Sequence, residues 1–151
     1  MNDDALWQRI HDSFQQQTLM HTIGASLTRV EAGKVDISLP FRDDLCQQHG
    51  FIHAGIITTI VDSAAGYAAY TLMPPDSEVL TVEFKVNFMA PAVGDLFIAR
   101  TAVKKAGRTL TVCTGDVFAQ RDGQEKLIVT MQATMICVRQ SAKGEGRGTT
   151  D

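Results

Sequence analysis

The stretch HAGIITTIVDSAAGYAAYTLM, from His53 to Met73, decides how the rest of the chain is arranged. Between Gly55 and Leu72 it contains no proline, lysine, arginine or glutamate, and apolar residues would cover nearly every face of a helix. Such a pattern is typical of a helix that is buried on all sides and not of an amphipathic surface helix. At about 1.5 Å per residue this helix spans roughly 27 Å, about the width of a small domain. We therefore expect one long central helix.

Asp62 is the single charged residue between Gly55 and Leu72. Its face of the helix carries small and hydroxyl-bearing residues, namely Thr58, Thr59, Gly66 and Tyr70. A lone carboxylate on a buried helix costs free energy unless it is paired, hydrogen-bonded or used in chemistry. The residues alone leave two explanations open: a structural Asp62, held by Thr58 or by backbone donors, and a catalytic Asp62.

Composition limits the classes of protein to consider. The apolar run approaches the roughly 20 residues of a membrane span, but Asp62 near its centre and the lack of basic flanks argue against one. A net charge of −3 argues against a nucleic-acid partner, which usually requires a basic patch. The N-terminal sequence has no secretory-signal pattern, and Cys46, Cys113 and Cys137 are too few and too scattered for a disulfide framework. We expect a cytoplasmic protein.

The segments around the central helix alternate as strands do. The clearest case is Thr81 to Phe88, whose alternation would put Thr81, Lys85 and Asn87 on one face. Strands are expected at residues 26–30, 35–39, 81–88, 96–103, 109–119 and 126–138. Because the turns between them are short, the strands should pair antiparallel. A curved antiparallel sheet wrapped around the helix would cover it on several sides, which makes an α+β fold.

The chain is expected to form one domain, residues 1–140. It begins with a short amphipathic helix at residues 3–17, whose apolar stripe is explained by core packing or by a partner surface. The last segment, residues 141–151, has no apolar residue larger than alanine and is expected to be disordered. A sheet wrapped around one helix leaves its outer face and edges for another subunit, so we expect a dimer.

The start of the central helix is a candidate anion site. The N–H groups of a first helical turn have no partners within the helix, and the helix dipole is positive there. Ala54 and Gly55 can thus offer backbone donors to a developing oxyanion, without a bulky side chain to block a ligand. Asp62 lies about two turns further along, roughly 10 Å away. A second subunit could bring its Asp62 close to this Ala54.

At this point the sequence resembles a known family. One spacing pattern is similar to that of hotdog-fold thioesterases of the PaaI-like and 4-hydroxybenzoyl-CoA thioesterase groups. It consists of Gln47, then five residues, then His53-Ala54-Gly55, then Asp62 nine positions after the histidine. The runs Asn87 to Ala92 and Gly107 to Leu110 also resemble that family. The resemblance covers roughly residues 25 to 138. It implies a hotdog fold, in which a curved antiparallel sheet wraps around one long buried helix.

The resemblance implies a role for each matching residue in hydrolysis of acyl-CoA thioesters. Asp62 would be the catalytic carboxylate, as a general base for water or as a nucleophile. The backbone N–H of Ala54 would polarise the thioester carbonyl, and Gln47 would position the carbonyl or the water. Thr81 would orient the water, and His53 would fix the geometry of the turn. Ala54 departs from the family pattern, which has glycine there, so a methyl group faces the thioester.

The substrate and the partners follow from the same resemblance. Phe88 and Asn87 would contact the substrate, and Lys104, Lys105 and Arg108 cluster in a turn where they can meet the phosphates of CoA. The expected assembly is a homodimer or a dimer-of-dimers tetramer with the active site at the subunit interface. No cofactor and no metal are expected, because hydrolysis of a thioester needs only a placed water, a base and an oxyanion site.

Other functions stay open. Cys46, His49, His53 and Asp62 are all of metal-ligand type. Cys46 with a nearby histidine would suit a thiol enzyme. Within the hotdog fold, the alternatives are a non-catalytic acyl-thioester binding module and a dehydratase or hydratase, which would pair an acid with a catalytic histidine. The preferred acyl group is not determined by the sequence.

Overall fold

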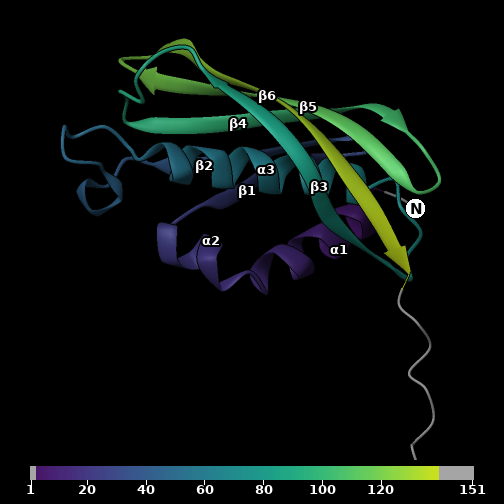
Figure 1. Ribbon diagram of the computed structural model, residues 1–151. Coiled ribbons are helices and arrows are strands. Elements are labelled where there is room, and N and C mark those ends of the chain that lie inside the picture. Colours follow the sequence, from purple (N-terminus) through teal and green to yellow (C-terminus); the bar gives the residue numbers. More distant parts are fainter. Residues whose placement is uncertain (1–2, 140–151) are drawn as a thin grey trace, which may run out of the picture.

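A six-stranded antiparallel sheet arches over one long helix, α3 (Ala54–Tyr70), as Figure 1 shows. The computed structural model describes residues 3–139, so the expected tail at 141–151 lies outside the described residues. The strands are β1 (Ser26–Glu31), β2 (Lys34–Pro40), β3 (Ser77–Phe88), β4 (Leu96–Ala106), β5 (Leu110–Arg121) and β6 (Gln124–Arg139). Their order in the sheet is β1-β2-β4-β5-β6-β3. The predicted α+β fold with a curved sheet around one helix is confirmed.

The N-terminal part differs in detail from the expected helix at residues 3–17. Helix α1 (Asp3–Gln15) ends two residues earlier, and a second helix, α2 (Thr18–Ile23), follows it. A short 3-10 turn, η1 (Asp43–Leu45), precedes the loop that leads into α3. Neither α2 nor η1 is long enough to show a helical period in the sequence, so the pattern gave no sign of them. Ile10 and Phe14 anchor α1 in the core.

Helix α3 packs against β2, β4 and β5 through side chains that are fully buried. Helix and sheet approach closely at Gly115 of β5, where an added Cβ would lie 2.7 Å from Val61 Cγ2. The expected burial on every face is wrong for the single chain. A stripe on the helix remains half-exposed, and it consists of Thr58, Thr59, Asp62, Ser63 and Gly66. The sheet of one chain leaves this polar stripe partly uncovered, beside the edge strand β3, where Thr81 donates to Asp62.

Strand β3 contains a bulge that changes which way its side chains face. Thr81 pairs with Met135 of β6, whereas Glu83 pairs with Thr134, so Val82 is the extra residue. A bulge shifts the alternation of the residues beyond it to the other face. Thr81 therefore lies on the side of the sheet that faces α3, while Lys85 and Asn87 lie on the outer side. The prediction that these three residues share one face is wrong.

Candidate active site

The first turn of α3 leaves one backbone donor open. The Gly55 N–H donates to His53 Nδ1 at 2.9 Å, and the N–H groups of Ile56 and Ile57 donate to the His53 carbonyl at 2.9 and 3.3 Å. Within residues 3–139 the Ala54 N–H has no hydrogen-bond acceptor. His53 thus caps the helix with both its ring and its carbonyl. The expectation that Gly55 also offers a donor is corrected, because His53 takes that N–H.

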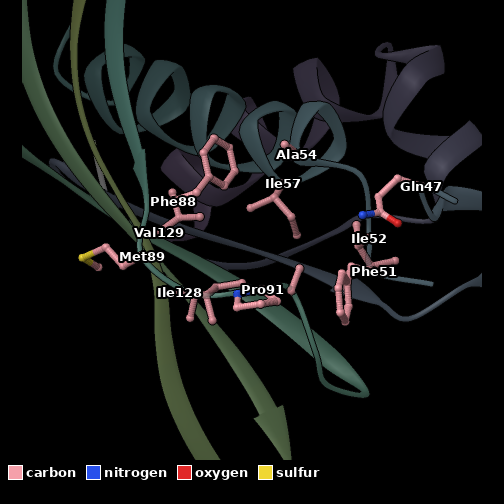
Figure 2. Close-up of a pocket in the computed structure, with 12 residues that line it drawn as sticks. Gln47, Phe51, Ile52, Ala54, Ile57, Phe88, Met89, Pro91, Ile128 and Val129 are labelled. Atoms are coloured by element: carbon pink, nitrogen blue, oxygen red, sulfur yellow. The ribbon is translucent and has the colours of Figure 1, made fainter. Parts of the chain in front are cut away.

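An apolar cavity of about 430 Å³ opens beside Ala54. Figure 2 shows it between the start of α3, the loop that carries Gln47 and Phe51, and the end of β3 with the following turn. It is lined by Gln47, Phe51, Ile52, Ala54, Ile57, Phe88, Met89, Ala90, Pro91, Ala92, Ile128 and Val129. The cavity therefore brings three predicted site residues together: Gln47, Ala54 and Phe88.

Gln47 is held at the edge of this cavity by a tight turn. Its backbone N–H donates to the Phe51 carbonyl at 2.8 Å, and its own carbonyl accepts from Gly50 N at 3.0 Å. Its side-chain Oε1 accepts from the His49 N–H. With the oxygen occupied, the Nε2 group of Gln47 is left to donate into the cavity, as a group that positions a carbonyl must do.

Asp62 lies in a second cavity of about 410 Å³, and its environment raises its pKa. Burial of the carboxyl raises the pKa above its ordinary value, and the hydrogen bond from Thr81 opposes this. Thr81 Oγ1 donates to Asp62 Oδ1 at 2.9 Å. The structural alternative in which Thr58 holds Asp62 is contradicted, because Thr58 Oγ1 donates to the Ala54 carbonyl at 2.9 Å. The structure brings Asp62 and Thr81 together, in a cavity that does not include Ala54.

The remaining predicted contacts do not join either cavity. Asn87 faces the outer side of the sheet, where its Oδ1 accepts from Lys85 Nζ at 2.8 Å. Lys104 and Lys105 are exposed at the far end of β4. Arg108 lines a separate cavity with Arg139, beyond the C-terminal end of α3. None of these side chains lies beside Ala54 or Asp62.

Cys46 is poorly suited to act as a nucleophile. Its Sγ donates to the carbonyls of Arg42 and Gly50 at 3.6 and 3.5 Å. Desolvation, together with the carboxylates of Asp43 and Asp44, raises the thiol pKa. A higher pKa leaves less of the reactive thiolate at neutral pH. This geometry weighs against the thiol-enzyme alternative.

Two further findings concern metals and membranes. Across residues 3–139, no three histidine, cysteine, aspartate or glutamate side chains lie together in a group that could hold a metal ion. In particular, His53 uses Nδ1 to cap α3, and the cavity that Asp62 lines includes neither Cys46 nor His49. In the same part of the chain, no helix is long and apolar enough to cross a membrane.

Sequence reasoning missed part of the wall around Asp62. Helix α1 and the residues after it contribute Ser13, Gln16 and Gln17 to that cavity. Ser13 lies within the apolar stripe of α1, before Phe14, and Gln16 and Gln17 follow it; core packing or a partner surface explained that stripe. Single polar residues at the end of a surface helix carry no periodic signal, so only the folded chain places them beside Asp62.

Comparison with known proteins defines the family. The sequence profile described as the thioesterase superfamily matches residues 49–126, just over half of the chain. A solved thioesterase family protein from Silicibacter pomeroyi is 49% identical, with a TM-score of 0.87, over 89% of this chain and 98% of that one. The chain belongs to the thioesterase superfamily, and its fold is the hotdog fold that the sequence pattern predicted.

More distant relatives agree with this assignment. A 1,4-dihydroxy-2-naphthoyl-CoA hydrolase from Listeria monocytogenes is 27% identical over 83% of this chain and 98% of its own length. The PaaI protein from the phenylacetic acid degradation operon of E. coli is 18% identical, with a TM-score of 0.79, over 90% of this chain and 94% of that one. At that identity the second match shows the fold alone. Together with the family, the first supports thioester hydrolysis.

Proposed function

We propose that the protein hydrolyses acyl-CoA thioesters to a free acid and CoA. The observation that carries this proposal is a pair of half-sites on α3, one at its first residue and one about two turns further along. One offers the open N–H of Ala54 beside Gln47, and the other offers Asp62 with Thr81. The first can stabilise an oxyanion, and the second can activate water. The esterase and CoA hydrolase names of the relatives support the same chemistry.

The proposed reaction needs no group beyond these residues and water. The Thr81 hydroxyl donates a hydrogen bond to Asp62, so the Thr81 oxygen can accept a hydrogen bond from the attacking water. As the water oxygen bonds to the thioester carbon, Asp62 takes its proton and the Ala54 N–H stabilises the oxyanion. The carbon–sulfur bond then breaks, and the CoA thiolate leaves and takes up a proton. The alternative role of Asp62 as a nucleophile would use the same contacts.

The two half-sites would meet in a homodimer. Strand β3 is an edge of the sheet, and Leu80, Val82 and Phe84 on it are 59%, 54% and 42% exposed. An exposed apolar edge strand is a template for pairing with another strand. Antiparallel pairing of two β3 strands would put the Thr81 end of one beside the Phe88 end of the other. Asp62 of one copy would then face Ala54 of the second. Within one chain these two residues line separate cavities, so the dimer would bring them to the same substrate.

The free thiols fit a reducing compartment. Cys46, Cys113 and Cys137 are all unpaired among residues 3–139. Because disulfides are rare in the cytosol, this supports the expected cytoplasmic location.

A dimer-of-dimers would use the outer face of the sheet, which carries Asn87 and its neighbours.

The activity can be tested with a panel of thioesters. Release of thiol from acetyl-, hexanoyl-, palmitoyl- and benzoyl-CoA is compared with hydrolysis of the matching p-nitrophenyl esters. We expect turnover of at least one CoA thioester and much slower hydrolysis of the oxygen esters. If every CoA thioester binds and none is hydrolysed, the non-catalytic binding module takes the place of this proposal. Hydration of enoyl-CoA without hydrolysis would favour the hydratase.

The shared site can be tested by mixing two inactive subunits. Asp62→Asn and Gln47→Ala each damage a different half-site, and a mixed dimer carries one site with both changes and one with neither. We expect the refolded mixture to regain activity that neither variant shows alone. A mixture no more active than the average of its two components would contradict the placement of the site between subunits.

A further inference from the structure

The side chain of Arg42 joins the end of α2 to the short turn η1. Its Nε and Nη2 groups donate to the two carboxylate oxygens of Asp44 at 3.0 and 2.5 Å, and its Nη1 group donates to the Thr22 carbonyl at 2.9 Å. Thr22 lies in the last turn of α2, where backbone carbonyls have no partner within the helix. One guanidinium therefore satisfies a helix-end carbonyl and binds both oxygens of a carboxylate, which suits the planar fork of arginine.

The same side chain packs against the residue that ends α2. Gly24 has a φ of +77°, in the left-handed region that favours glycine at the end of a helix. A Cβ added to Gly24 would lie 3.4 Å from Nη1 of Arg42 and 3.9 Å from its Cδ. Arg42 thus lies beside α2 along its stem as well as at its tip.

The turn η1 is the base of the loop that carries Gln47. The Leu45 N–H donates to the Arg42 carbonyl at 3.1 Å, so the backbone of Arg42 begins this turn while its side chain clamps it. The Leu45 carbonyl accepts from the His53 N–H at 2.9 Å, and His53 is the residue that caps α3 beside Ala54. The loop between Leu45 and His53, with Gln47 in it, is therefore closed on η1.

Few buried contacts hold this loop in place. Among residues 41–55 only Ile52 is buried, and residues 48–51 are all exposed. A segment with so little buried apolar surface opens more easily than the core, so its polar contacts decide how well it keeps its position. The hydrogen bond from Arg42 to Thr22 is such a contact, because it ties the base of the loop to a helix.

We propose that Arg42 is a positioning residue of the half-site at Ala54. It holds the base of the loop against α2, so that the amide of Gln47 stays directed at the substrate carbonyl. This inference rests on the proposed function for the role of Gln47, and it adds a residue that stands outside the pattern from Gln47 to Asp62. Arg42 does not line the cavity at Ala54, so its effect on the reaction must pass through the loop.

The exposure of this ion pair makes its effect local. The side chains of Arg42 and Asp44 are 40% and 65% exposed, and an exposed ion pair adds little to the free energy of unfolding. Its loss leaves the buried contacts between α3 and the sheet in place, but it frees η1 to move relative to α2. A small displacement of a positioning group slows a reaction strongly even in an intact fold. Loss of the Arg42 side chain should therefore slow turnover more than it lowers stability.

A second ion pair of the same chemistry provides a matched control. Arg29 donates from Nε and Nη2 to the two carboxylate oxygens of Glu31, both at 2.8 Å, and this pair also joins residues two positions apart. The Arg29 side chain is 44% exposed, close to the value for Arg42, and it lines neither the Ala54 nor the Asp62 cavity. Arg42→Met and Arg29→Met thus remove the same kind of pair, and only the first should loosen the loop.

Hydrogen exchange tests the clamp without relying on catalysis. The N–H groups of Gln47 and His53 are protected by bonds to backbone carbonyls at 2.8 and 2.9 Å. We expect Arg42→Met to speed exchange of these two amides by about tenfold or more, the size of one charge-assisted hydrogen bond, and to leave amides beyond the first turn of α3 unchanged. Arg29→Met should keep the wild-type rates. Unchanged exchange in Arg42→Met, or an equal rise in both variants, would overturn the inference.

Turnover of two substrates tests the link to the reaction. The acyl group that the protein hydrolyses fastest is presented as its CoA thioester and as its pantetheine thioester, which lacks the phosphates. We expect Arg42→Met to lower kcat by about tenfold on both, with KM within about twofold of the wild type, and Arg29→Met to change neither. A loss confined to the CoA thioester would mean that Arg42 binds phosphate, and equal kcat in the two variants would remove any role in positioning. Either result would overturn the inference.

Failure of the proposed function would be distinguishable from failure of this inference. A wild type that hydrolyses neither thioester would refute the proposed function. The exchange of the Gln47 and His53 amides would still decide whether Arg42 holds the loop.

Discussion

Thr81 on β3 donates a 2.9 Å hydrogen bond to Asp62 on α3, and the bulge at Val82 is what lets it do so. Thr81 precedes the bulge and faces the helix, while Lys85 and Asn87, with the same parity in the sequence, face outward. Bulges next to active sites re-aim side chains in this way. One inserted residue thus couples a hydroxyl to the carboxylate on which the proposed chemistry depends.

Thr81→Val should move the pH dependence of hydrolysis. Burial raises the pKa of Asp62 and the Thr81 hydrogen bond lowers it, so removing this bond raises the pKa further. A general base works only when deprotonated, so activity falls as the pH falls through its pKa. The acidic limb of the kcat/KM profile should therefore shift to higher pH. Thr81→Ser keeps the hydroxyl, so its acidic limb should coincide with that of the wild type. An acidic limb of Thr81→Val that stays in place or moves to lower pH would contradict the effect of Thr81 on the pKa of Asp62.

Asp62→Asn should stabilise the protein at neutral pH. Because burial raises the pKa of Asp62, the folded state binds more protons than the unfolded state between the ordinary and the raised pKa. The free energy of unfolding therefore falls as the pH rises through that window, and above it the buried charge is a net cost. Asparagine removes this cost, so the Tm of the variant should exceed the wild-type Tm at neutral pH. The difference should vanish at about pH 3, where the carboxyl is protonated. A lower Tm for the variant than for the wild type at neutral pH would contradict a net cost of the buried Asp62 charge.

His53→Ala should weaken both the fold and the proposed oxyanion site. The change removes the Nδ1 acceptor of the Gly55 N–H, at a cost of about 0.5–2 kcal/mol for a lost helix cap. The first turn of α3 then loses the contact that orients Ala54, so kcat/KM should fall as well. His53→Asn supplies a side-chain oxygen in the same place and should recover most of the stability. Equal denaturation midpoints for the two variants would show that the cap is unimportant.

Gly115→Ala should destabilise the contact between α3 and the sheet. The new Cβ would lie 2.7 Å from Val61 Cγ2 and 2.8 Å from Thr101 Cγ2, closer than packed carbon atoms can come. Overpacking of this kind costs about 1–3 kcal/mol, which urea denaturation can measure. Gly66→Ala is the contrasting control, since no atom beyond the neighbouring backbone of its own helix lies within 4 Å of its added Cβ and alanine favours helix. The two variants should shift the free energy of unfolding in opposite directions.

The fold was largely predictable from the sequence because its strongest pattern is also its central element. The apolar run around Asp62 is typical of a buried helix, and short turns between alternating segments indicated antiparallel strands. The prediction of burial on every face failed for a physical reason. Hydropathy does not distinguish a helix covered by its own sheet from one whose polar stripe is left for a second chain or a ligand.

The candidate site was predictable only where a motif carried it. Gln47, Ala54 and Asp62 stand at spacings that resemble the family, and the structure puts each beside a cavity. The bulge that turns Thr81 inward has no sequence signal, because an extra residue in an alternating strand shows only in its pairing. Arg42 stands outside that motif, and its partner Thr22 lies 20 residues away. Contacts at such separations come from the tertiary fold.

Thiol release from the acyl-CoA panel by the wild type and by Asp62→Asn shows directly whether this carboxylate drives hydrolysis. We expect turnover by the wild type and a loss of about 10²-fold or more in the variant, the scale expected when a general base is removed. Because the variant should be at least as stable as the wild type, such a loss could not be ascribed to unfolding. Undiminished turnover by Asp62→Asn would contradict the assignment of Asp62 as the catalytic carboxylate.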